Sequence, residues 1–113
     1  MRRALLAAAL VITVPPAAAC TVSAPYRPLT ARPPGTQTVL TVDVLALDLR
    51  RYPAIARVRV VGGGKPGVTL AISYKRAPCG GAREPVRDER LVVFLRGTEA
   101  LRWATPAEAR AIR

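Results

Sequence analysis

Residues 68–75, VTLAISYK, constrain the fold more than any other stretch, because their side chains alternate between two classes without a break. One class is apolar or aromatic, and the other is small, hydroxyl-bearing or charged. A period of two predicts a β-strand with one buried face. Residues 55–61 alternate in the same way, and GGGKPG at 62–67 joins the two segments as a reversal. We therefore expect a β-hairpin over this region.

Two further segments predict strands. TVLTVDVLALDL at 38–49 is rich in aliphatic residues, but its alternation slips near Asp43 and Val44, as a β-bulge or strong bend would produce. A helix over 45–51 is the alternative. RLVVFLR at 90–96 is apolar on both faces, which predicts a strand buried in the middle of the sheet. Long bent first strands are common in small barrels, so we expect a mostly β fold that forms a small closed or partly open barrel.

The C-terminal part predicts a last short strand followed by a short helix. Residues 100–103 are suited to the strand, and TPAE at 105–108 carries the signals of a helix start. Thr105 is expected at the N-cap, Pro106 at the first helical position and Glu108 at the third, where its side chain completes a capping box.

The N-terminus has the order of features of a secretory signal peptide. Arg2 and Arg3 precede an apolar run over 4–14, two prolines end the run, and Ala17–Ala19 offers small residues for cleavage. A short buried N-terminal helix is the alternative. We expect a signal peptide at 1–19, a proline-rich extended arm at 20–37 and the barrel domain at 38–113, in a chain that is exported to the periplasm or secreted.

The charge balance is strongly basic. The formal net charge is +11, and removal of Arg2 and Arg3 with the signal peptide leaves +9. One interpretation is a composition bias that places arginines on a solvated surface. The other is attraction to an anionic envelope polymer or to lipid headgroups, with Arg57 and Arg59 as the expected contact residues. An unidentified envelope protein is a further possible partner, and no nucleic acid is expected in an exported compartment.

The residues that enzymes commonly use are scarce. The chain has no histidine, and neither Ser23 nor Ser73 lies in a nucleophile motif. GGGKP lacks the first glycine and the final hydroxyl residue of a phosphate-binding loop, so a hairpin turn explains it. We expect no catalytic residues, no metal site and no cofactor, and hence no enzyme.

Cys20 and Cys79 both survive cleavage after Ala19. An oxidising compartment permits a disulfide between them. A lipid anchor on Cys20 is the alternative, which would make the chain an outer-membrane lipoprotein, although Ala17 stands where a lipobox normally carries a branched aliphatic residue.

The order of these features resembles the netrin-like (NTR) modules, which include the tissue inhibitors of metalloproteinases. The matching elements are Cys20, the strand at 38–49, the hairpin, Cys79-Gly80 and ERLVVFLRG. The resemblance implies an OB-like barrel and a bond between Cys20 and Cys79. The inhibitors begin Cys-x-Cys, whereas this chain has Cys20-Thr21-Val22. We therefore expect a binding or structural module of a bacterial-type cell envelope, with inhibition of a secreted metalloprotease or a lipid-anchored envelope role as alternatives.

Overall fold

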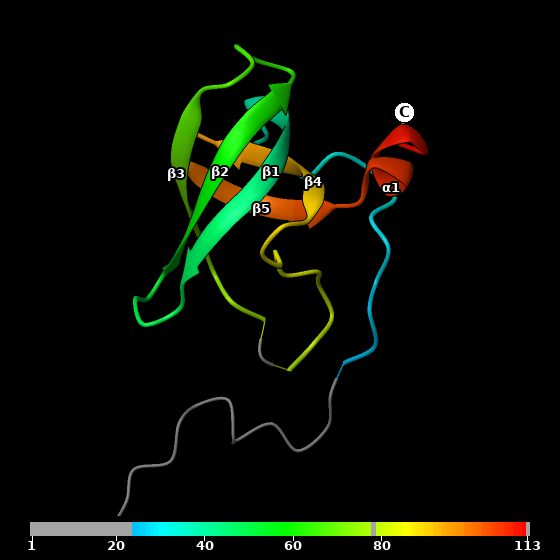
Figure 1. The fold of residues 1–113 in the computed structure, drawn as a ribbon. Coiled ribbons are helices and arrows are strands. Elements are labelled where there is room, and N and C mark those ends of the chain that lie inside the picture. Colours follow the sequence, from blue (N-terminus) through cyan, green and yellow to red (C-terminus); the bar gives the residue numbers. More distant parts are fainter. Residues whose placement is uncertain (1–23, 78, 113) are drawn as a thin grey trace, which may run out of the picture.

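Five strands close into a barrel in the order β1-β2-β3-β5-β4, as the computed structural model shows (Figure 1). The structure describes residues 24–77 and 79–112. The elements are β1 (Thr38–Asp48), β2 (Ala54–Gly62), β3 (Thr69–Tyr74), β4 (Arg90–Arg96), β5 (Glu99–Ala104) and helix α1 (Pro106–Arg110). Neighbouring strands are antiparallel except β3 and β5, which pair in parallel through Ser73 and Glu99. The expected mostly β, OB-like barrel with a short C-terminal helix is confirmed.

The slip in the first strand is a β-bulge. The register of β1 against β2 shifts between Val44 and Ala46, so Leu45 has no partner of its own on β2. Leu40, Val42 and Val44 therefore face the core before the bulge, and Leu47 packs against the same core after it. The alternative of a helix over 45–51 is wrong, because β1 continues to Asp48.

Both faces of β4 are buried, as expected, and the strand lies between β1 and β5, with which it pairs. Val93 and its neighbours of the same parity enter the barrel core, while Val92 and Phe94 point outward. Helix α1 and the N-terminal arm cover that outer side, where Leu29, Val39, Ala104, Ala109 and Ile112 complete a second apolar cluster.

The reversal between β2 and β3 requires glycine for a steric reason. Gly63 has a φ of +82°, and a Cβ at this position would collide with the carbonyl oxygen of Val39 and lie 3.2 Å from the Cα of Leu40. The turn therefore folds closely over β1. The positive φ and the lack of room for a Cβ explain why this position is glycine, so no phosphate-binding role is needed to explain it.

Helix α1 begins as the sequence predicts. The Thr105 hydroxyl accepts a hydrogen bond from the Glu108 amide at 3.1 Å, and the Glu108 carboxylate accepts one from the Thr105 amide at 2.9 Å. Pro106 occupies the first turn. This capping box stabilises a helix too short to form by itself.

The described part of the proline-rich arm is attached to the barrel (Figure 1). Ala24 forms an isolated parallel bridge with Gly80, and the Arg27 amide donates to the Gly81 carbonyl at 3.0 Å. The Arg102 guanidinium donates to the Arg27 carbonyl from β5. The arm therefore runs along the side of the barrel where α1 lies. The signal peptide expected at 1–19 lies outside the described residues.

A candidate anion-binding face on the outer side of the barrel

Arg57 and Arg59 both lie on the outer face of β2, where the alternation of the sequence placed them. Both side chains are exposed. Arg59 lies opposite Asp43 on β1 and Thr69 on β3, whereas Arg57 lies opposite Ala46 and Ala71. The two arginines therefore share one face but have different neighbours.

Arg59 belongs to a charge group that one carboxylate compensates in part. The Asp43 carboxylate accepts two hydrogen bonds from Arg90 of β4, at 2.8 and 3.1 Å, and Arg59 adds its charge from the other side. The hydrogen bond from Arg90 is the main cause of a lowered pKa of Asp43, and the charges of Arg90 and Arg59 act in the same direction. One carboxylate is thus shared by two guanidinium groups. The two hydrogen bonds hold Asp43 and Arg90 together, and the three residues keep one net positive charge.

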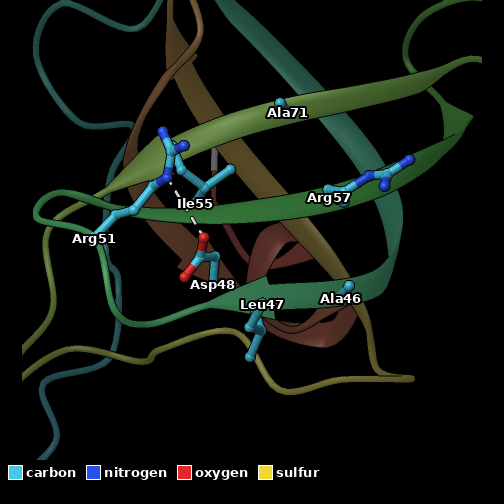
Figure 2. A pocket seen from close by; sticks show the side chains of 7 residues that line it. All are labelled: Ala46, Leu47, Asp48, Arg51, Ile55, Arg57 and Ala71. Atoms are coloured by element: carbon cyan, nitrogen blue, oxygen red, sulfur yellow. Dashed lines mark ion pairs between the residues drawn. The ribbon is translucent and has the colours of Figure 1, made fainter.

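Arg57 has no ion pair or hydrogen bond with any of the described residues. Its guanidinium stands beside a shallow pocket of about 370 Å³ on the outer surface of β1, β2 and β3 (Figure 2). The pocket is lined by Ala46, Leu47, Asp48, Arg51, Ile55, Arg57 and Ala71. Because both cross-strand neighbours of Arg57 are alanines, the sheet surface is hollow next to a charge that has no counter-ion.

The opposite end of the pocket is formed by the turn between β1 and β2. Asp48 accepts a hydrogen bond from the Arg50 amide at 3.1 Å and pairs with the Arg50 and Arg51 side chains at 3.4 Å each. Figure 2 shows Arg51 and Asp48 directed toward each other, with Ile55 beside them and Arg57 farther along β2. The backbone hydrogen bond from Arg50 is the main cause of a lowered pKa of Asp48. This carboxylate therefore holds the turn in place.

The tip of this turn is both basic and apolar. Tyr52 is 85% exposed and Leu49 is 45% exposed, although both are large apolar side chains. They flank Arg50 and Arg51, whose side chains are 93% and 70% exposed. The sequence patterns did not identify these residues as a possible site. The signal that could have found this feature is the pair of arginines followed by tyrosine between two well-defined strands.

Cys79, in the loop between β3 and β4, lies beside the arm. Its carbonyl accepts a hydrogen bond from the Ala24 amide. No free cysteine occurs among the described residues. Cys20 lies outside them, so the pairing of Cys20 with Cys79, and a lipid on Cys20, remain predictions.

Two absences hold for residues 24–77 and 79–112. No group of three His, Cys, Asp or Glu side chains in this part of the chain could hold a metal ion. Within the same residues, no helix is long and apolar enough to cross a lipid bilayer.

Comparisons with known protein families, with curated protein sequences and with solved structures find no match for this chain.

Proposed function

We propose that this chain is a non-catalytic, exported binding module that attaches to anionic material of the cell envelope. The observation that carries the proposal is the unpaired guanidinium of Arg57 at the rim of an apolar pocket. Arg51 lines the other end of the pocket, and the exposed Tyr52 follows Arg51 in the chain. We call the outer surface from Arg59 to Tyr52, with this pocket, the β2 face.

The chemistry of the β2 face favours a ligand that combines negative charge with an apolar part. Arg57 and the exposed arginines of the turn supply positive charge, and the described residues as a whole carry an excess of it. Ala46, Ile55 and Ala71 supply an apolar floor. Tyrosine at such a place suits a boundary between apolar and aqueous surroundings, because it has an apolar ring and a polar tip. Lipid headgroups or a substituted acidic polymer have this combination.

Vesicle binding of the mature chain tests the proposal. Vesicles of zwitterionic lipid are compared with vesicles that also contain an anionic lipid, and a soluble acidic polysaccharide is tested in parallel. We expect binding to the anionic forms that weakens as salt rises, because exposed charges are screened within about 10 Å at 0.1 M salt. Binding that is equal on neutral vesicles, or unchanged at high salt, would overturn the proposal.

Two variants locate the site. Arg57→Gln should lower affinity for anionic vesicles about fivefold, since one basic residue near such a surface contributes about 1 kcal/mol. The matched control Arg110→Gln removes the same charge from α1, which packs on β4 and β5, and should have a smaller effect. Tyr52→Ser should weaken binding to vesicles but not to the polysaccharide if lipid is the ligand. An equal loss from Arg57→Gln and Arg110→Gln would assign the binding to net charge alone.

We propose further that Cys20 bonds to Cys79. The support is the position of the arm: Ala24 pairs with Gly80 and its amide donates to Cys79, and Cys20 lies only four positions before Ala24. A segment of that length spans at most about 14 Å. The bond would join the arm to the loop between β3 and β4 at a point where the backbones already meet.

A further inference from the structure

β3 and β5 share fewer residue pairs than any other two neighbouring strands of the barrel. The two strands share the pair Ser73 and Glu99, supported by a hydrogen bond from the Ser73 amide to the Thr98 carbonyl at 3.0 Å. Next to this pair lies a cavity of about 280 Å³, which we call the seam cavity. It is lined by Tyr74, Lys75, Ala77, Ala82, Arg83, Arg96, Glu99, Ala100, Leu101, Arg102 and Trp103.

Three side chains in the wall of the seam cavity carry buried donors without a partner. They are the hydroxyl of Tyr74, Nε1 of Trp103 and Nε of Arg102. Tyr74 and Trp103 are only 2% and 3% exposed, and their rings pack edge to face with centroids 5.7 Å apart. Buried polar atoms in native proteins nearly always have a hydrogen-bond partner. Three atoms without one, on residues that line the same cavity, therefore require an explanation.

The charges around the seam cavity have one predominant sign. Lys75, Arg83, Arg96 and Arg102 are basic, and Glu99 is the one acidic residue of the lining. Glu99 is paired with Arg96 at 3.4 Å, and Arg83 pairs with Glu108 at 3.3 Å. Lys75 and Arg102 have no acidic partner among the described residues. The cavity therefore has a positive excess.

The orphaned groups also specify what they would bind. The indole Nε1 and the guanidinium Nε can only donate hydrogen bonds. Burial raises the pKa of Tyr74, and the nearby charge of Glu84 adds to this, so the hydroxyl keeps its proton and remains a donor. A complementary ligand accepts hydrogen bonds and carries negative charge.

We propose that the seam cavity binds a small oxyanion, the carboxylate, phosphate or sulfate group of a ligand, through Tyr74, Arg102 and Trp103. This site is separate from the β2 face and does not depend on the proposed function. The three donor atoms are shielded from solvent in the free chain. We therefore expect binding to draw the wall residues toward the oxyanion and to change the surroundings of the Trp103 indole.

Trp103 is the single tryptophan of the chain, so its fluorescence reports on the seam cavity directly. The mature protein is titrated with inorganic phosphate, sulfate or acetate, with chloride at matched ionic strength as the control. We expect a saturable change with at least one oxyanion and none with chloride. The oxyanion that acts distinguishes a phosphate, a sulfate and a carboxylate site. The same weak response to all four salts would overturn the proposal.

Tyr74→Phe is the decisive variant, because it keeps the ring that packs on Trp103 and removes only the orphaned hydroxyl. We expect oxyanion affinity to fall about three- to tenfold, the usual effect of one hydrogen bond. The melting temperature should stay level or rise, since a buried donor without a partner is removed. Arg57→Gln, on the β2 face, should leave the titration unchanged. Wild-type affinity in Tyr74→Phe, or a loss in Arg57→Gln, would overturn the proposal, and neither result would bear on vesicle binding.

Discussion

The hydroxyl of Tyr26 donates a hydrogen bond to the Glu108 carboxylate, although the two residues are 82 positions apart. The Arg83 guanidinium lies over the Tyr26 ring, 5.1 Å from its centroid, and pairs with Glu108 at 3.3 Å. Glu108 also caps helix α1 through Thr105. One carboxylate thus joins the N-terminal arm, the loop before β4 and the C-terminal helix.

Tyr26→Phe should weaken this junction without removing the ring beneath Arg83. A hydrogen bond to a charged group in a partly exposed place contributes roughly 1 kcal/mol. That corresponds to a fall of about 4–8 °C in the melting temperature of a domain of this size. Thermal unfolding followed by circular dichroism measures it. An unchanged melting temperature would show that this hydrogen bond adds nothing to the stability of the barrel.

The same junction should make stability depend on pH. Partial burial tends to raise the pKa of Glu108, but the hydrogen bonds from Tyr26 and Thr105 and the charge of Arg83 outweigh it and lower the pKa. A carboxylate with a lowered pKa stabilises the fold above its unfolded value, near 4.5, and loses this contribution as the pH falls through the folded value. Stability should therefore fall below about pH 4.5. The loss in Glu108→Gln should be smaller than in the wild type, because Glu108 no longer titrates. Part of the loss should remain, because Asp43 and Asp48 also have lowered pKa values.

Gly80→Ala should detach the arm from the barrel. Gly80 has a φ of +90°, and a Cβ there would collide with the carbonyl oxygen of Ala24. Gly67→Ala is the matched control, because Gly67 has a φ of +87° but open space around its Cβ position. Both variants carry backbone strain, yet only Gly80→Ala should speed proteolytic cleavage within residues 24–37. Equal cleavage in the two variants would refute this role of Gly80.

The proposed Cys20–Cys79 bond predicts that the denatured, unreduced protein has no titratable thiol. Cys79→Ser should lower the melting temperature by several degrees or more, since closing a loop of about 60 residues stabilises by up to about 4 kcal/mol. Cys20→Ser should have the same effect, because both variants remove the same bond. If Cys20 instead carries a lipid, Cys20→Ser alone would release the protein from membranes. Intact mass of the exported protein separates the two outcomes.

The local elements follow from the sequence because their causes are local. The alternation in β2 and β3 predicts the hairpin, and the parity slip after Asp43 predicts the bulge, whose position at Leu45 is set by pairing with β2. The capping box at Thr105 needs only residues three positions apart. The outward direction of Arg57 and Arg59 follows from the same period of two.

Only the tertiary structure decides what each outward side chain meets, because neighbours across strands depend on the closure of the barrel. Arg59 lies beside Asp43 of β1, whose carboxylate also binds Arg90 of β4, whereas Arg57 meets two alanines and keeps an unpaired charge. The outer face of β4 is buried because α1 and the arm return to cover it. The seam cavity lies where β3 and β5 share a single pair, and that pairing joins residues 26 positions apart, which no local pattern records.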